Sequence, residues 1–486
     1  MSAPLVILAV GFAVAIALGL AARRGHEMNL EQWSVGGRTF GTVFVFLLMA
    51  GEIYTTFTFL GGSGWAYGKG GPALYILCYG ASAYAFSYFL LPVIWRFARE
   101  HRLVSQADFF VVKFNSPALG VLVALVSVAA LVPYLVLQLK GLGIIVSEAS
   151  YGSVTPTAAV WAGAAALTVY VVVSGVRGSA WTSALKDVMI LGVAIVLGIY
   201  LPLHYYGGYG AMFAAIDQAH PGLLTLPSAG MSPSWFISTV LLTATGFFMW
   251  PQFFAGAYTA RNEDVFRRNA VLLPLYQLII LFVFFAGFAA VLQVPGLKGA
   301  DGDLSLLRIS RQAFSPAGVG VIGAAGLLTA LVPGSMILIT AATILSQNVY
   351  RVVVPSATDR AVGLLARALV PVIALTAVWL TLRGGEAIVP LLLMGYNLVT
   401  QLFPALMVSL TRRPLARAPA AAAGVLAGVA TVALLTTTGA SVATLLPWAP
   451  QAVKDLNVGL VALGVNALVL VVVGVATRRP ANRATS

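Results

Sequence analysis

Long apolar segments recur from one end of the chain to the other, with short polar stretches between them. An α-helix needs about 20 apolar residues to cross roughly 30 Å of hydrocarbon. The pattern predicts about thirteen transmembrane helices, near residues 3–22, 41–66, 72–98, 117–148, 157–176, 181–203, 235–258, 268–294, 318–350, 360–383, 386–409, 418–439 and 456–477. No stretch between them is long enough for a soluble domain, so residues 1–486 are predicted to form one all-α membrane domain.

Composition and charge support this prediction. Hydrophobic residues make up 60% of the 486 residues and charged residues only 9%, and the mean hydropathy is +0.94. A soluble globule of this size needs more polar surface. The net charge of +13 does not indicate a nucleic-acid partner, because the basic residues gather in alternate loops. Their placement predicts a periplasmic N-terminus and a cytoplasmic C-terminus in a bacterial inner membrane.

The chain offers little for an enzyme active site or a cofactor. Its one cysteine, Cys78, lies in a predicted helix, and no metal-ligand cluster or haem motif accompanies it. No ATP-binding loop of the Gly-x4-Gly-Lys-Ser/Thr kind is present, so an ion or solute gradient must supply the energy. We expect no catalytic residues, resident metal, cofactor or ATP, and the expected partners are a small organic anion and the lipid bilayer.

Two predicted helices are interrupted in a similar way. The second carries Glu52, a threonine-rich stretch at 54–58 and three glycines, and the seventh carries Thr243, Gly246 and the run 250–252. They open two successive five-helix blocks at about 41–203 and 235–409, with 3–22, 418–439 and 456–477 as peripheral helices. Interrupted helices at matching positions of two halves indicate a transporter's midplane site, because unwound backbone can bind ions and charged groups. The alternative is that Gly and Thr merely allow close helix packing.

Several motifs resemble the sodium/solute symporter family. They lie at residues 33–41, 107–109, 113–114, 174–177, 186–187 and 346–351, so the resemblance covers about residues 30–410. It implies thirteen helices and a LeuT-type inverted five-plus-five repeat. Within the family, the segments at 54–59, 133–139, 267–270 and 331–333 look most like the bacterial monocarboxylate permease branch, which takes up lactate, pyruvate and related acids.

The sequence departs from the ion site that this resemblance implies. Family members that use sodium usually carry a Ser-Ser or Ser-Thr pair in the ninth helix, whose hydroxyls join backbone carbonyls of the second helix around the ion. Val332 and Pro333 take that place, and neither side chain offers oxygen to a hard cation. Thr329, one turn earlier, is the remaining ion-coupling candidate. We therefore expect a proton as the driving ion, with sodium as the alternative.

Two acidic residues are further candidates for ion coupling. Glu52 lies in an apolar context, where an ionised carboxylate is costly and commonly functional. It could instead cap unwound backbone or pair with a basic residue. Asp187 matches an acidic family position associated with the cytoplasmic ion path, but it could equally pair with Arg177 or Arg351. Lys186 is its sequence neighbour, so the two are expected to face different directions on their helix.

Polar and aromatic side chains near the breaks are the candidates for substrate binding. They are Tyr54, Thr55, Thr56, Thr58, Trp250 and Gln252, together with Asn397 and Gln401, which align on one face of the eleventh helix. Hydrogen bonds between helices and a proline kink are the alternative explanations. Lys140 could neutralise a substrate carboxylate, although snorkelling to the outer interface is its favoured role.

These features predict a secondary active transporter, a symporter-type permease for small organic solutes. Monocarboxylates such as lactate or pyruvate are the favoured substrates and a proton the favoured coupling ion. The alternative is a sodium-coupled symporter of another small organic solute. A channel is a weaker alternative, because a pore does not need two matched helix breaks.

Overall fold

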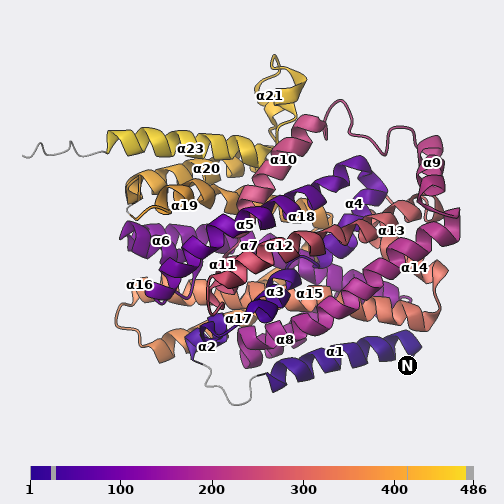
Figure 1. The fold of residues 1–486 in the computed structure, drawn as a ribbon, viewed down its shortest axis with the longest axis horizontal. Helices are drawn as coiled ribbons and strands as arrows, with labels where there is room; N and C mark the ends of the chain where they lie inside the picture. Colours follow the sequence, from indigo (N-terminus) through magenta and orange to yellow (C-terminus); the bar gives the residue numbers. More distant parts are fainter. Residues whose placement is uncertain (1, 23–28, 413, 478–486) are drawn as a thin grey trace, which may run out of the picture.

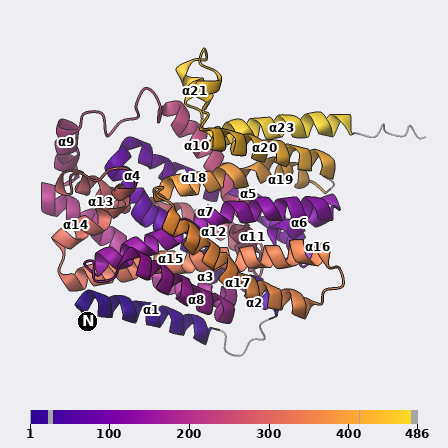
Figure 2. The ribbon, with the colours of Figure 1, turned by 180° about the vertical axis from the view of Figure 1, so that it is seen from behind.

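The structure is a computed structural model that describes residues 2–22, 29–412 and 414–477. The described residues form helices and no β-strand; a single isolated bridge joins Phe40 and Ala260. Figures 1 and 2 show a bundle with α1 (Ala3–Ala21) at one edge and α20 (Ala418–Thr438) beside α23 (Val458–Ala476) at the opposite edge. The prediction of an all-α protein is confirmed.

Ten helices of the described residues are long and apolar enough to cross a membrane, and one bent pair adds an eleventh span. The ten are α1, η3–α5 (Gly71–Glu100), α7 (Pro117–Ala149), α8 (Pro156–Tyr206), α12–α13 (Asp264–Gln293), α15–α16 (Pro316–Val353), α17 (Asp359–Arg383), α18–α19 (Ile388–Ser409), α20 and α23. The bent pair joins Pro233–Met249 to Pro251–Tyr258 at 47°. Nine of these ten helices and the bent pair each lie within a few residues of one predicted segment, and α8 covers two predicted segments, because long apolar runs determine the spans.

The longest helix, α8, contains a sharp break at Gly175. The φ and ψ angles of this residue are 58° and −160°, far from helical values. A straight helix of 51 residues would be about 76 Å long, more than twice the hydrocarbon thickness. The break divides α8 at the point where the sequence predicted a boundary between two helices.

The second predicted helix is broken, as expected. It consists of α3 (Thr42–Gly51), η2 (Phe57–Gly61) and α4 (Gly62–Lys69). Its second half packs closely on α13 (Ile280–Gln293) at Gly287. The approach is so close that a Cβ added at Gly287 would lie only 2.2 Å from the Ser63 carbonyl oxygen. The break itself faces α15 (Pro316–Ile344), which lies in the core of the bundle.

Short helices that the hydropathy pattern did not predict connect the long ones. They are α2 (Leu30–Val35), η1 (Gly36–Arg38), α6 (Gln106–Phe114), α9 (Tyr209–Ala219), η5 (Gly299–Leu304), α14 (Ser305–Ala313), α21 (Val442–Leu445) and α22 (Gln451–Lys454). All are far shorter than a membrane span, so their apolar residues do not stand out from the surrounding loops.

Helix α6 joins two of the family-like motifs. Ser105 and Asp108 form a capping box at its start, and the Asn348 amide donates to Asp108 Oδ1 at 2.6 Å. The Ser105 hydroxyl in turn donates to Asn348 Oδ1 at 2.6 Å. Burial raises the pKa of the Asp108 carboxyl group, while hydrogen bonds from Asn348, Val104 and Ser105 act in the opposite direction. These contacts fix α6 against the end of the α15–α16 span.

The break at Gly175 generates a stability prediction. Gly175→Ala should destabilise the protein by roughly 1–3 kcal/mol, because the residue has a positive φ and an added Cβ would lie 2.8 Å from the Trp33 carbonyl oxygen. Gly192→Ala in the same helix is the matched control, since nothing lies within 4 Å of its added Cβ. Thermal unfolding in detergent should show a lower Tm for the first variant only. Equal Tm values for both variants would contradict the prediction.

Candidate functional site

The first break is held together by its own threonines. Residues 52–55 form turns and bends rather than a helix. The Thr58 hydroxyl donates to the Ile53 carbonyl at 2.7 Å and accepts from the Thr55 amide at 2.9 Å. Thr55 Oγ1 accepts from the Phe57 amide at 3.1 Å. Both threonines therefore satisfy backbone groups that the interrupted helix leaves unpaired.

Two other side chains attach the first break to neighbouring helices. The Thr56 hydroxyl donates to Gln138 Oε1 of α7 at 2.7 Å. The Tyr54 hydroxyl donates to the Tyr276 carbonyl of α12 (Asp264–Leu278) at 3.3 Å. In this conformation, Tyr54, Thr55 and Thr56 make the interhelical and local hydrogen bonds that were the alternative to substrate contact.

The second break lies at Trp250. Helix α10 (Pro233–Gly246) tightens into η4 (Phe247–Met249), Trp250 is extended, and α11 (Pro251–Tyr258) follows. Pro251 begins α11 at a position where its missing N–H costs no hydrogen bond. The proline therefore marks the start of the new half-helix.

A small cavity lies between the two breaks. It is lined by Glu52, Ile53, Phe57, Thr58, Tyr79, Gly80, Tyr134, Phe247, Trp250, Phe253, Gln277, Leu392 and Tyr396. Its volume is about 20 Å³, room for a single water molecule. The surrounding helices must therefore move apart before a solute can enter.

Glu52 is the one lining residue of this cavity with a carboxyl group. Its side chain is only 6% exposed, and neither carboxyl oxygen has a partner at hydrogen-bond distance in the described part of the chain. The Gln252 amide and the Lys186 ammonium nevertheless lie near enough to interact with this carboxyl group. Gln252, in the first turn of α11, is also buried with both amide atoms unpaired. Leaving such groups without partners costs roughly 1–3 kcal/mol each, more for charged groups. Unpaired buried polar groups at the two breaks indicate a site for a polar ligand or a proton.

Aromatic rings form part of the cavity wall together with Glu52. The Trp250 ring lies 4.9 Å from that of Tyr134 and 5.2 Å from that of Tyr396, centroid to centroid. Tyr79 continues the wall at 5.7 Å from Tyr396. These tyrosines lie on α5 (Tyr75–Glu100), α7 and α18 (Ile388–Val399) and were not among the predicted site residues. A buried tyrosine in a membrane helix is a weak signal unless the helix faces are known.

Asn397 and Gln401 do not line this cavity, and of the other predicted substrate residues only Thr58 and Trp250 do. The Gln401 amide donates to the Gly459 carbonyl of α23, and Asn466 of α23 donates to the Gln401 carbonyl at 2.6 Å. An added Cβ at Gly459 would lie 2.3 Å from Asn397 Oδ1. Both residues join α18 and η7 (Thr400–Leu402) to the peripheral helix α23.

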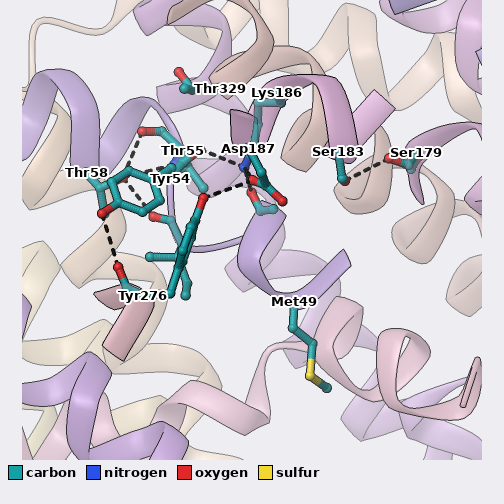
Figure 3. Close-up of polar contacts among 12 residues, drawn as sticks. Met49, Tyr54, Thr55, Thr58, Ser179, Ser183, Lys186, Asp187, Tyr276 and Thr329 are labelled. Carbon is teal, nitrogen blue, oxygen red and sulfur yellow. Dashed lines mark hydrogen bonds and ion pairs between the residues drawn. The ribbon is translucent and has the colours of Figure 1, made fainter. Parts of the chain in front are cut away.

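Lys186 and Asp187 do not face different directions, contrary to our expectation. The flexible lysine side chain brings Nζ within 3.0 Å of Asp187 Oδ1, and the Tyr276 hydroxyl donates to the same oxygen at 3.3 Å (Figure 3). Arg177 and Arg351 are occupied elsewhere, by the Gly36 carbonyl and by Asp359. Asp187 therefore pairs with its own neighbour beside the first break.

Helix α15 corresponds to the predicted ninth helix, and near the first break it presents methyl groups. A Cβ added at Gly51 would lie 3.4 Å from Val332 Cγ1 and 2.9 Å from the Ser183 hydroxyl. Thr329, drawn in Figure 3, donates its hydroxyl to the Gly326 carbonyl of its own helix. Val332 therefore faces the break, where the resemblance places a sodium-binding hydroxyl.

Lys140 lies away from the cavity. Its Nζ is 3.7 Å from Asp303 Oδ2 and donates to the Glu386 carbonyl, so it does not snorkel freely. Asp303, on η5, also accepts from the Ile388 amide at 3.0 Å. Burial raises the pKa of the Asp303 carboxyl group to about 6, although Lys140 lowers it. Lys140 thus links α7 to η5 and to the start of α18.

A bundle of membrane-spanning helices with two breaks around a buried cavity defines a multi-pass membrane carrier. A model of the sodium:solute symporter family matches residues 33–409. The chain belongs to this family, and it is a transporter rather than an enzyme.

Known relatives agree with this assignment. The chain is 62% identical over 479 residues to the uncharacterized symporter YhjB of Bacillus subtilis (strain 168), covering 99% of this chain and 98% of that protein. It is 27% identical over 355 residues to a monocarboxylate transport permease protein of Rhizobium johnstonii, covering 72% and 71% of the two chains. The structure of a Na⁺-coupled sialic acid symporter in a substrate-bound outward-open state matches with a TM-score of 0.79. At 15% identity over 98% of this chain and 97% of that one, this match shows a shared LeuT-like fold.

Proposed function

We propose that the protein is a permease that takes up small monocarboxylic acids, such as lactate or pyruvate, together with a proton. The observation that carries the proposal is the unpaired Glu52 carboxyl group in the cavity between the two breaks. The similarity to a monocarboxylate transport permease protein supports the class of substrate. The mostly aromatic lining suits a solute with few polar groups once the helices have moved apart.

A carboxylate substrate would find hydrogen-bond donors at the breaks. The first turns of η2–α4 and of α11 point their positive dipole ends toward the break regions. In the closed conformation the amides of Thr56 and Phe57 are bound by Gln138 and Thr55, so a substrate would have to replace those acceptors. Gln252, in the first turn of α11, adds an amide without a partner. None of the described residues that line the cavity is basic. The half-helix ends would therefore provide the favourable interactions, together with the amide of Gln252, which does not line the closed cavity but precedes Phe253, which does.

Charge balance favours a proton as the companion of the anion. An ionised Glu52 and a bound carboxylate would place two negative charges in one buried cavity, and like charges in low dielectric repel strongly. Protonation of Glu52 removes one of them. Proton loading and substrate binding would therefore favour each other, as symport requires.

The alternative is a sodium-coupled symporter of another small organic solute. The sialic acid symporter with the same fold is Na⁺-coupled. In this chain, however, α15 places a methyl group of Val332 rather than a hydroxyl group near Gly51, and the hydroxyl of Thr329 is engaged within its own helix. We therefore favour the proton.

We also propose that the chain crosses a bacterial inner membrane thirteen times, with a periplasmic N-terminus and a cytoplasmic C-terminus. Beyond the eleven spans described above, the break at Gly175 would divide α8 into two, and α3 with η2–α4 would form the broken second helix. Two five-helix repeats, about 41–203 and 235–409, would then carry one broken helix each at their starts.

This topology predicts which positions react with reagents outside the cell. In a Cys78→Ser background, Gly208→Cys should be labelled by a membrane-impermeant maleimide, since it lies between α8 and α9 on the proposed periplasmic side. Ser356→Cys, in the exposed loop before α17, is the control and should react only after permeabilisation. The reverse pattern would refute the orientation.

The substrate proposal predicts a specific loss of affinity. In proteoliposomes supplied with a panel of labelled monocarboxylates, Gln252→Val should raise the apparent KM about ten-fold or more, because a hydrogen bond to a charged group is lost. Gln401→Leu is the matched control and should leave KM within about two-fold, since its amide contacts α23. If the wild-type protein takes up none of the acids, the proposed substrate class is wrong. If the two variants have equal KM values, the proposed position of the substrate site is wrong.

The coupling proposal predicts uptake without sodium. In sodium-free buffer, an inward proton gradient should drive accumulation by the wild-type protein. Glu52→Gln should abolish this accumulation, because the amide cannot carry a proton, and yet retain substrate counterflow. Initial uptake rates and counterflow at equal protein amounts test both statements. Strict dependence of the wild type on sodium, or a Gln variant that still concentrates substrate with the proton gradient, would contradict the proposal.

A further inference from the structure

Lys186 places a positive charge among the free carbonyl groups of the first break. Its Nζ donates to the Gly51 carbonyl at 2.7 Å and to the Tyr54 carbonyl at 3.2 Å, and lies 3.0 Å from Asp187 Oδ1. Figure 3 shows Lys186 and Asp187 of α8 reaching toward the segment that carries Tyr54 and Thr55. A lysine ammonium has three N–H donors, and these three oxygens match that number.

The lysine is fully buried, which makes this arrangement informative. Its exposed fraction is 0%, and a buried charge is tolerated only where paired and hydrogen-bonded. The oxygens around it come from two elements, the end of α3 with its break and the helix α8. Two backbone carbonyls and one carboxylate are also the kind of oxygen set that binds a hard metal cation.

The remaining neighbours of Gly51 complete the surroundings. A Cβ added at Gly51 would lie 2.9 Å from the Ser183 hydroxyl of α8 and 3.4 Å from a Val332 methyl group of α15. Ser183 donates to the Ser179 carbonyl one turn back, so its oxygen keeps an acceptor site. Of these two side chains, only the one from α8 offers an oxygen.

We propose that the Lys186 ammonium is a tethered cation, which takes the place of an external metal ion between the first break and α8. This inference deepens the proposed function and rests on it, because it gives the physical reason why a member of this family would work without sodium at this position. The carbonyl groups are already bound by a charge that the protein supplies itself. An external cation would have to displace a covalently attached competitor.

A simple structural ion pair is the competing explanation, and removal of the lysine distinguishes the two. Without the ammonium, the Gly51 and Tyr54 carbonyls and the Asp187 carboxylate would be left facing the vacated position with a net negative charge. If Lys186 is a tethered cation, its removal should leave a site that binds an external cation. A structural pair leaves only an unpaired carboxylate and a weaker protein.

The test is the cation dependence of thermal stability, measured on purified full-length protein in detergent without substrate. Sodium chloride replaces choline chloride at constant ionic strength. The Tm of Lys186→Ala and of Lys186→Met should rise with sodium in a saturable way, by about 2 °C or more, because a bound ligand stabilises the folded state. The wild type should show no such rise, and neither should Lys69→Ala, a control at an exposed lysine.

A double variant sharpens the result. Lys186→Ala combined with Asp187→Asn should lose the sodium response, because the carboxylate ligand is gone. A saturable rise of the wild-type Tm with sodium would overturn the proposal. Folded Lys186 variants whose Tm does not change with sodium would overturn it as well. If neither Lys186 variant folds, the wild-type titration decides alone. The measurement needs no substrate, so failure of the monocarboxylate proposal would appear only in the uptake panel and leave this result unchanged.

Discussion

The requirement that every backbone polar group in a membrane interior find a partner governs the centre of this protein. Interrupting a helix at residues 52–56 releases N–H and C=O groups into a region without bulk water. Thr58 and Thr55 recover some of these hydrogen bonds locally, and Lys186 binds two of the freed carbonyls. The break persists because side chains from its own segment and from α8 satisfy it together.

This requirement also explains why the neighbouring helices approach so closely. Gly51 has no room for a Cβ beside Ser183, and Gly141 of α7 has none beside Thr56, where an added Cβ would lie 2.5 Å from the threonine. Small residues at these positions let α7 and α8 reach the unwound segment, and their contacts hold it in one conformation. A change of conformation during transport must therefore exchange these hydrogen bonds for others of similar strength.

Much of the fold follows from the sequence, because hydropathy reports burial in lipid directly. The long helices and both breaks were predicted from apolar runs and from clusters of Gly, Thr and Pro. Two features of the site were not. Adjacent residues point apart on a helical wheel, yet the four-carbon stem of Lys186 lets its ammonium curl back to Asp187. Helical spacing also aligned Asn397 with Gln401, but periodicity cannot say whether that face meets a cavity or another helix, here α23.

The charge of Lys186 has a consequence for the energetics of uptake. A charge that belongs to the protein is not released with the solute, so a cycle that moves one carboxylate and one proton transfers no net charge across the bilayer. The membrane potential, which contributes about 2.3 kcal/mol per elementary charge at 100 mV, then does no work on the cargo. Such a carrier would concentrate its acid only as far as the pH difference allows, about ten-fold for each pH unit, since one pH unit corresponds to about 1.4 kcal/mol.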